Sequence, residues 1–436
     1  MNAEILRATI YHTPRNPFLD IGGLETFSDG GLAIEGERIR GCGDFDELRR
    51  RFPAAQVRDL RGGFLLPGFV DSHVHYPQVR VLGALGHELL DWLKQSALPE
   101  ETRMGDRDYA RCVAGEFLRA LASHGTTTAL VFGAHFTSAM DVFFEAAVSA
   151  GLRIISGLVI SDRMLVPQLH VSAAEAYRQN GDLIRRHHGR GVEYAVTPRF
   201  ALSASEALLE VCQTLMREHQ GIRFQTHINE NTSEIAEVAR LFPWASDYLA
   251  VYEKFNLVSD RSVLAHNVHA ADEMLARLGA HRAAVAHCPS SNASLGSGLF
   301  PLRRHIKAGV RVALGTDVGG GTGFGMLKEA LQAYLLQRLS PEGLTLTPAQ
   351  LLYLATRAGA EALGLSEETG DFSAGRSADF VYLRPPEGSP LEAVTKNAED
   401  ARQVLAALFT LAGSESVVET RVRGREVYRV EEMCAL

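Results

Sequence analysis

The sequence predicts a mixed α/β protein: a distorted (β/α)8 TIM barrel with a small β-sandwich domain built from the N- and C-terminal segments. Strand-like and helix-like stretches alternate through the middle of the chain, giving eight strands with helical crossovers. Both ends instead contain short strand-like runs broken by Gly, Asp and Pro. We therefore expect residues 1–66 and 371–436 to form the composite β-sandwich domain, and residues 67–370 to form the catalytic barrel.

Composition narrows the functional class. The 436 residues are 46% hydrophobic and 22% charged, with a formal net charge of -8, which is typical of a soluble globular protein. The chain has no basic stripe, which argues against a nucleic-acid partner, and no run approaches the ~20 apolar residues of a membrane span. The first ten residues contain Glu4 and no long apolar run, so we expect no signal peptide. Five scattered cysteines without a CxxC pair favour a reducing cytoplasm.

The terminal segments are expected to be β-rich, with one early helix at residues 45–52. Short apolar runs predict six strands there, with Gly424 as a turn signal between the last two. The predicted strands span residues 5–11, 31–35, 38–43, 378–383, 417–422 and 425–430.

The middle of the chain is expected to supply the eight barrel strands. The first is the apolar run that leads through Pro67 and Gly68 into His73 and His75. The other seven are predicted at residues 125–133, 152–160, 192–200, 222–229, 261–268, 283–288 and 311–317. Helices are predicted at residues 107–123, 139–150, 173–188, 205–219, 232–241, 248–255, 270–278 and 326–365. The helical tail favours a closed barrel over an open doubly wound sheet.

His73 and His75 begin the clearest candidate site. Residues i and i+2 of a strand point to the same face, so the two imidazoles aim at one point. His227, His266 and Asp317 lie at the ends of later predicted strands, where a barrel carries its active site. The predicted ligands of one divalent metal are His73, His75, His227 and Asp317. These nitrogen and oxygen donors suit Zn²⁺, with Fe²⁺ as the alternative, and no thiolate is needed.

The same residues define candidate catalytic groups. A metal with these ligands lowers the pKa of its water toward neutrality. Asp317 can accept that water's proton, His266 can polarise the water, and Glu230 can shuttle a proton to the substrate. Considered alone, His266 could be a core histidine and Asp317 could be a helix N-cap. Candidate residues at the ends of four predicted strands argue against coincidence.

These motifs resemble the amidohydrolase superfamily, in its metal-dependent aminohydrolase branch. The resemblance rests on residues 67–75, on His227 and His266, and on Gly315-Thr316-Asp317. It narrows to the guanine deaminase family through His75-Tyr76-Pro77-Gln78, Thr197-Pro198-Arg199-Phe200, His227-Ile228-Asn229-Glu230-Asn231 and His287-Cys288-Pro289-Ser290-Ser291-Asn292. The similarity covers nearly the whole chain.

The resemblance implies hydrolytic deamination of guanine to xanthine and ammonia, with one zinc ion per subunit in a homodimer. Gln78 and Arg199 would then read the polar edges of the purine and Phe200 would pack on its face. Glu230 would protonate N3 of the base, while Asp317 would pass the water's proton to the leaving amine. Ordinary loop solvation is the alternative for Gln78 and Arg199. The residues expected to bind the substrate are His75, Gln78, Arg199, Phe200, His227 and Asp317.

Other details leave alternatives open. Predicted strand four, residues 192–200, contains no lysine, which predicts one metal rather than the two of relatives that use a carboxylated lysine. Ala97, Leu98 and Ala293 depart from the family pattern, so a deaminase of a modified purine, a pterin or a triazine is the second hypothesis. A catalytically dead metal-binding scaffold is the third, and the presence of Glu230 with every ligand argues against it.

Overall fold

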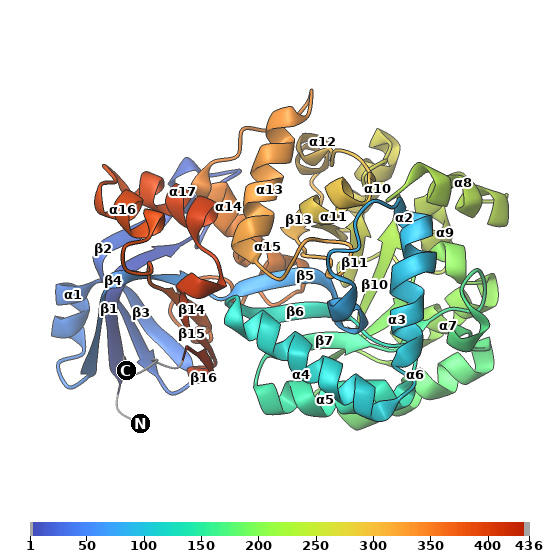
Figure 1. The fold of residues 1–436 in the computed structure, drawn as a ribbon, viewed down its shortest axis with the longest axis horizontal. Coiled ribbons are helices and arrows are strands. Elements are labelled where there is room, and N and C mark those ends of the chain that lie inside the picture. The colour runs from blue at the N-terminus through green and yellow to red at the C-terminus, as the bar shows by residue number, and fades with distance from the viewer. Residues whose placement is uncertain (1–2, 431–436) are drawn as a thin grey trace.

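The computed structural model describes residues 3–430, and its strands form two sheets that lie side by side in Figure 1. The larger sheet follows the order β13-β12-β11-β10-β9-β7-β6-β5, with the short strand β8 paired to β9. The smaller sheet follows the order β16-β15-β14-β4-β1-β2-β3. Helices surround the larger sheet (Figure 1), which gives the mixed α/β barrel architecture that the sequence predicts. Among the described residues, no helix is both long and apolar enough to cross a membrane.

Strands from both ends of the chain share the smaller sheet. β4 (Gln56–Pro67) pairs with β1 (Glu4–His12) on one side and with β14 (Phe380–Leu383) on the other. Leu6 and Phe380 are buried in the same apolar cluster on this sheet. The predicted β unit from both termini is therefore confirmed, and its seven strands form one hydrogen-bonded order. The other members are β2 (Glu25–Glu35), β3 (Arg38–Asp44), β15 (Val417–Val422) and β16 (Arg425–Arg429), and α1 (Phe45–Arg51) packs beside β2 and β3.

The chain passes from the smaller sheet to the barrel at Gly68. β4 ends at Pro67 and β5 (Phe69–His75) begins the barrel, so the apolar run that the sequence suggests as one strand belongs to two sheets. A Cβ atom at Gly68 would lie 2.2 Å from the side chain of Thr127, so only glycine fits at this crossing. The exact limits of the two domains stay a prediction.

The barrel is built from parallel strands and is closed by backbone hydrogen bonds. Every neighbouring pair along its path is parallel. The Asp317 N–H donates to the His73 carbonyl at 2.8 Å, and the His75 N–H donates to the Val318 carbonyl at 3.0 Å, which joins β5 to the segment after β13. The remaining strands are β6 (Thr126–Phe132), β7 (Arg153–Gly157), β8 (Val159–Ile160), β9 (Glu193–Pro198), β10 (Arg223–Ile228), β11 (Ser262–His266), β12 (Ala284–His287) and β13 (Arg311–Leu314).

Several barrel strands end earlier than the sequence predicts, and two of them lead into candidate catalytic residues. β11 stops at His266 and β13 stops at Leu314, whereas the apolar runs predict strands to residues 268 and 317. His266, Asn267 and Asp317 have φ values of 71°, 49° and 48°, in the left-handed region that a strand cannot continue. The chain therefore turns at the barrel mouth, and two candidate catalytic residues lie on these turns.

The predicted helices are present with small shifts at their ends. The helices predicted within residues 326–365 are three, and Pro341 and Pro348 separate the first from the second: α13 (Met326–Leu339), α14 (Pro348–Ala355) and α15 (Arg357–Ala362). The others are α4 (Arg107–Ser123), α5 (Thr137–Ala150), α6 (Ala173–His187), α7 (Glu206–Glu218), α8 (Thr232–Leu241), α9 (Tyr248–Lys254), α10 (Asp272–Ala280), α11 (Pro289–Ser294) and α12 (Leu302–Lys307).

Two helical regions lie where the sequence analysis assigned none. Residues 82–106, called the cap segment below, contain α2 (Leu89–Trp92), a π-helical turn at residues 93–97, and α3 (Leu98–Arg103). The C-terminal region contains α16 (Pro390–Lys396) and α17 (Ala401–Leu411), and α17 packs against α13 and α14. The buried Leu405 and Leu408 show the helical spacing that predicts α17. The C-terminal segment, which was expected to be β-rich, therefore also contains two helices that the sequence analysis did not predict.

Candidate active site

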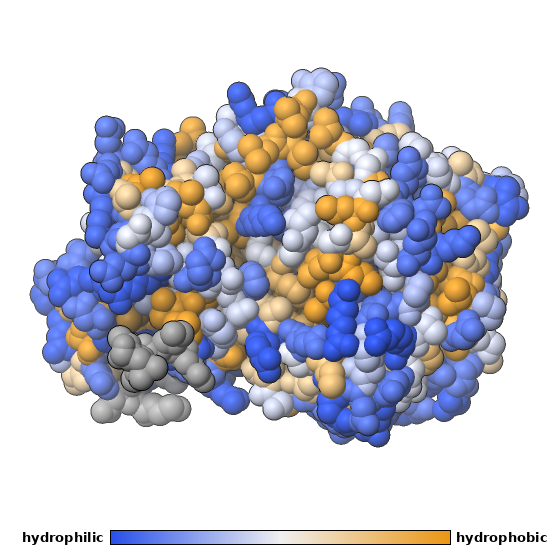
Figure 2. Space-filling model, in the orientation of Figure 1, coloured by the Kyte–Doolittle hydropathy of each residue, from blue (hydrophilic) through white to orange (hydrophobic). Residues whose placement is uncertain are grey.

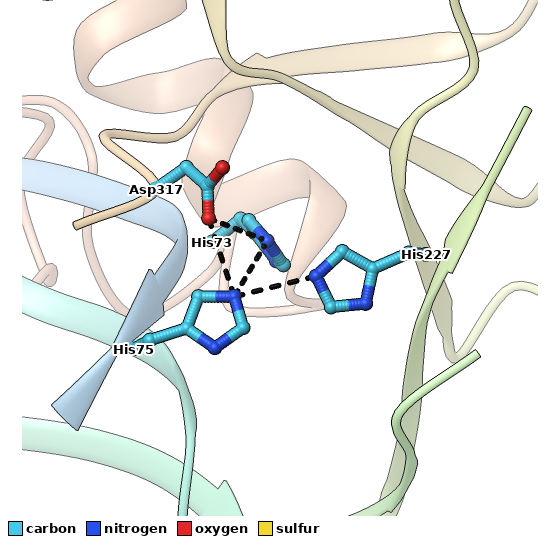
Figure 3. Close-up of side chains that lie close together, drawn as sticks. All are labelled: His73, His75, His227 and Asp317. Atoms are coloured by element: carbon cyan, nitrogen blue, oxygen red, sulfur yellow. Dashed lines mark hydrogen bonds and ion pairs between the residues drawn. The ribbon is translucent and has the colours of Figure 1, made fainter. Parts of the chain in front are cut away.

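Three histidines and one aspartate converge at the barrel mouth (Figure 3). His73 and His75 lie in β5, His227 lies in β10, and Asp317 follows β13. His75 Nε2 lies 3.3 Å from the Nε2 atoms of both His73 and His227. Asp317 Oδ1 lies 3.2 Å from the Nε2 atoms of both His73 and His75. All four side chains are buried, so motifs far apart in the sequence form one cluster.

The cluster fits a divalent metal ion. Ligands placed 2.0–2.1 Å from a tetrahedral zinc ion lie about 3.3 Å apart, and the separations above agree with this value. The His227 Nδ1–H donates to the Arg199 carbonyl at 2.6 Å, which leaves its Nε2 lone pair facing the cluster. Burial lowers the pKa of His227 well below its ordinary value and the pKa of His75 to about 4, so both imidazoles are neutral at pH 7, as metal ligation requires.

Asp71 holds the ends of β5 and β13 together beneath the cluster. Its Oδ1 accepts hydrogen bonds from the Thr316 N–H at 3.0 Å and from the His73 N–H at 3.2 Å. A Cβ atom at Gly315 would lie 2.8 Å from His73 Cβ, so glycine permits this close approach. Asp317 is the residue after Thr316, so the Asp71 hydrogen bonds and the close approach at Gly315 together fix its position beside His73.

Glu230 and His266 form a second buried pair beside Asp317. His266 Nε2 lies 3.5 Å from Glu230 Oε2 and 3.8 Å from Asp317 Oδ2. Its Nδ1–H donates to Asn292 Oδ1 at 3.0 Å, which leaves Nε2 as an acceptor. His266 also lies close to His73 and Cys288, but burial raises the pKa of the Cys288 thiol well above its ordinary value, so this thiol does not ionise.

The two carboxyl groups beside the cluster differ in protonation. Burial and then the charge of Asp317 raise the pKa of Glu230 to about 8. Burial also acts to raise the pKa of Asp317, but the imidazoles of His73 and His75 close to its carboxylate outweigh burial and hold that pKa well below its ordinary value. At pH 7 Glu230 therefore carries a proton and Asp317 is ionised, which is the pairing that an acid–base site needs.

A small cavity beside the cluster is lined by Gln78, Arg199 and Phe200, the residues that the sequence analysis assigns to a purine. Trp92 and Leu93 of the cap segment also line it. The cavity has a volume of about 20 Å³, which is room for about one water molecule.

The cap segment also supplies an acidic residue that the sequence analysis missed. Glu101, in α3, accepts hydrogen bonds from Arg199 Nη1 at 2.6 and 2.7 Å and from Gln78 Nε2 at 2.7 Å. Burial acts to raise the pKa of Glu101, but the charge of Arg199 outweighs it and holds that pKa well below its ordinary value. Glu101 is therefore a buried anion that contacts both predicted base-reading side chains.

The residues singled out as departures from the family pattern lie away from the cavity. Ala97 and Leu98 are buried in the main apolar core, and Ala293 is exposed. Their neighbours Trp92, Leu93 and Leu295 line the cavity instead. The sequence analysis thus identified the correct segments, but it had no signal for which side chains of a short helix face inward.

Known proteins resemble the chain over nearly its whole length. A family model described as the amidohydrolase family matches residues 64–427, and a bacterial imidazolonepropionase-like composite domain matches residues 30–55. A protein of Deinococcus radiodurans named probable guanine deaminase is 56% identical over 435 residues, which cover 98% of this chain and 99% of that protein. The guanine deaminase of Escherichia coli is 38% identical over 422 residues, which cover 96% of this chain and 95% of that protein.

Solved structures have the same fold. The E. coli guanine deaminase structure matches with a TM-score of 0.93 at 36% identity, covering 99% of this chain and 100% of that one. A guanine deaminase from C. acetobutylicum, with guanine bound in its active site, matches with a TM-score of 0.91 over 98% of this chain and 100% of that one. At 24% identity, the second match speaks to the fold alone. With the full-length relatives above 30% identity and the family model, these findings show that the chain belongs to the amidohydrolase family, among its guanine deaminases.

Proposed function

We propose that this protein hydrolyses guanine to xanthine and ammonia, using one zinc ion held by His73, His75, His227 and Asp317. One observation carries the proposal. The ligand cluster, the Glu230–His266 pair, and Gln78 with Arg199 meet at one buried pocket. The likeness to the guanine deaminase of E. coli and to the probable guanine deaminase of D. radiodurans supports the choice of substrate.

The overall reaction breaks the C2–N bond of the exocyclic amine and forms a C2–O bond with oxygen from water. A divalent metal in the histidine–aspartate cluster supplies Lewis-acid activation of water at neutral pH. The chain's own residues move the two protons that the reaction requires, and they hold the base.

Glu230 acts as the proton donor to N3 of the purine because its raised pKa keeps it protonated at pH 7. Asp317, which stays ionised, accepts one proton from the attacking water and delivers it to the departing amine, and the water's second proton returns to Glu230 as the C2=O bond forms. His266 Nε2, an acceptor within reach of both carboxyl groups, orients the water. Arg199 and Gln78 donate to the carbonyl oxygen of the base, and Phe200 packs on its ring.

Three broader features belong to the same proposal. Zinc is our choice of metal because three histidines and one carboxylate suit Zn²⁺, with Fe²⁺ as the alternative. A homodimer is supported by the resemblance and by the strongly exposed Leu19, Ile21 and Leu339, and Figure 2 shows further hydrophobic atoms over the outer part of α13. A cytoplasmic location is supported by four free cysteines among the described residues, while Cys434 lies outside them.

Purified, zinc-loaded protein should release ammonia from guanine and shift the ultraviolet absorbance from that of guanine to that of xanthine. Other aminopurines, pterins and aminotriazines form the comparison panel, measured at equal concentrations. Turnover confined to guanine supports the proposal. Faster turnover of another member of the panel would show that the enzyme catalyses the same reaction on that substrate instead. Metal-loaded protein that is inactive on the entire panel contradicts the proposed reaction.

A further inference from the structure

Glu101 joins three strand-end segments of the barrel to the cap segment. Its carboxylate contacts Gln78, which follows β5, and Arg199, which follows β9. His135, which follows β6, places its Nε2 3.3 Å from Glu101 Oε2. The Glu101 side chain is 2% exposed, so water does not compete for these contacts. One carboxylate therefore sets the position of both predicted base-reading side chains.

The contact with Glu101 fixes which way the Gln78 amide points. Gln78 Nε2 donates to Glu101 at 2.7 Å, while Gln78 Oε1 accepts from the Gly319 N–H at 3.1 Å. A flipped amide would place its oxygen against the Glu101 carboxylate and its NH₂ group against the Gly319 N–H, so both contacts would become repulsive. The second N–H of Gln78 is thereby held in one direction.

Glu101 orients Arg199 by the same means. Both hydrogen bonds from Arg199 to Glu101 use Nη1, and no other side-chain nitrogen of Arg199 forms a hydrogen bond within residues 3–430. The planar guanidinium is therefore held through Nη1 alone, and its remaining N–H groups can donate to a ligand in the cavity that Arg199 lines. Gln78 and Arg199 thus offer the cavity donors rather than acceptors.

A donor-lined edge selects for a base with a carbonyl oxygen at that edge. A purine 6-oxo group accepts hydrogen bonds, whereas a 6-amino group donates them and a 6-unsubstituted purine makes neither contact. We propose that Glu101 is a positioning residue that gives this enzyme its preference for 6-oxopurines, acting through Gln78 and Arg199. The inference rests on the proposed function, because it assumes that those two side chains face the purine.

The test compares two substrates that carry the same 2-amino group. Guanine has the 6-oxo group with its adjacent N1–H and 2-aminopurine lacks both, so the change in the ratio of their kcat/KM values between variant and wild type reports recognition of the C6–N1 edge. In Glu101→Gln the value for guanine should fall about 10- to 100-fold, the usual cost of losing charge-assisted hydrogen bonding, while that for 2-aminopurine falls much less. Adding Glu101→Gln to Arg199→Gln should change the ratio little further, because both act on the same contact.

Glu100→Gln is the matched control. Glu100 is the preceding residue of α3, and its carboxylate contacts Arg103 and Tyr109 rather than the base-reading pair. This variant should keep the wild-type substrate ratio. Metal content and the thermal unfolding temperature are measured for each variant. Glu101→Asp keeps the negative charge on a shorter side chain and should lower the substrate ratio less than Glu101→Gln. It replaces Glu101→Gln in the test if that variant does not fold.

Inhibition by hypoxanthine and by unsubstituted purine gives the same comparison without turnover, since neither carries a 2-amino group. Weaker inhibition of Glu101→Gln by hypoxanthine alone supports the inference. Equal losses for both substrates and both inhibitors would show a merely structural role and overturn it. A wild-type enzyme that deaminates guanine but does not prefer it to 2-aminopurine also overturns it, whereas inactivity of the wild type on guanine overturns the proposed function itself.

Discussion

Glu101 and Glu230 are buried beside the same cavity, yet their carboxyl groups carry different charges at neutral pH. Burial and the charge of Asp317 raise the pKa of Glu230 to about 8. Burial acts on Glu101 in the same direction, but Arg199 outweighs it and the pKa lies well below its ordinary value. Equal burial therefore produces a proton donor on one side of the cavity and an anion on the other.

This difference separates two walls of the site. The metal-side wall consists of the four ligands with Glu230 and His266, which lie in barrel strands or directly after them. The cap-side wall consists of Gln78, Arg199, Phe200 and Trp92, and Glu101 of the cap segment contacts Gln78 and Arg199. Changes in the first wall should reduce turnover or metal binding, whereas changes in the second should alter KM and substrate choice.

Loss of a metal ligand should have the largest effect. His227→Ala should lose bound zinc and reduce guanine turnover about a thousandfold or more, because several kcal/mol of transition-state stabilisation depart with the metal. Chelation of the wild type should do the same and lower the unfolding temperature, since a ligand at 1,000 times its Kd stabilises the fold by about 4 kcal/mol. Elemental analysis and calorimetry measure both effects.

The control for the ligand variant is His281→Ala, which removes a partly exposed histidine beside Glu253. It should retain zinc, turnover and the wild-type unfolding temperature. A His227→Ala protein with a full complement of zinc and normal turnover would show that the cluster is not the catalytic metal site.

Removal of the proton donor should have the next largest effect. Glu230→Gln keeps the size and burial of the side chain but cannot donate an acidic proton, so kcat should fall about 10²- to 10⁴-fold while zinc content is unchanged. Steady-state kinetics and elemental analysis test this pair of results. Glu237→Gln, which changes a partly exposed glutamate paired with Arg240 in α8, the helix that follows Glu230, should behave as the wild type. A near-normal rate in Glu230→Gln would remove Glu230 from the mechanism.

The metal-side wall could be predicted from the sequence because its signals are local. Alternation along a strand brings His73 and His75 to one face, and the barrel rule brings His227 and Asp317 to the same mouth. These inferences need only the strand positions, and the structure brings all four side chains together. The exact ends of the strands could not be predicted from the sequence, because the positive φ values of His266 and Asp317 depend on the turns that close the barrel.

The cap-side wall could be predicted only in part. Gln78 and Arg199 were identified through family resemblance, but Glu101 carries no motif and meets Arg199 across 98 residues of chain. The short helices of the cap segment are too brief for hydrophobic periodicity to indicate their inward face. Their positions are set by packing over the barrel mouth, which no local pattern describes.

A smaller effect is expected from truncation of the cap. Trp92 is buried and lines the cavity, so Trp92→Ala should raise the KM for guanine about tenfold through lost apolar contact, with a lesser change in kcat and none in zinc content. Trp244→Ala is the matched control, because the second tryptophan of the chain is 42% exposed. If Trp92→Ala lowers kcat or zinc content with KM unchanged, the two walls are not separable as described.

The smallest effect expected is a shift in the pH profile. Glu230 donates only while protonated, and its protonated fraction falls as the pH rises through about 8, so kcat/KM for guanine should decline on the basic side. The Ser297 hydroxyl donates to Glu230 Oε1 at 3.3 Å and favours the ionised form, which lowers this pKa. Ser297→Ala should therefore move the basic limb to higher pH, by less than about one unit.

Glu101 supplies no limb of its own between pH 5 and 9, since its pKa lies far below that range. The basic limb should accordingly stay in place in Glu101→Gln even where kcat/KM is reduced. Ser294→Ala, which changes the last residue of α11, three residues before Ser297, should leave both the position and the height of the limb unchanged. A basic limb that moves downward in Ser297→Ala would assign the titration to a different group. A limb that moves with Glu101→Gln would mean that the anion and the proton donor are electrostatically coupled across the cavity, and that the two walls act as one.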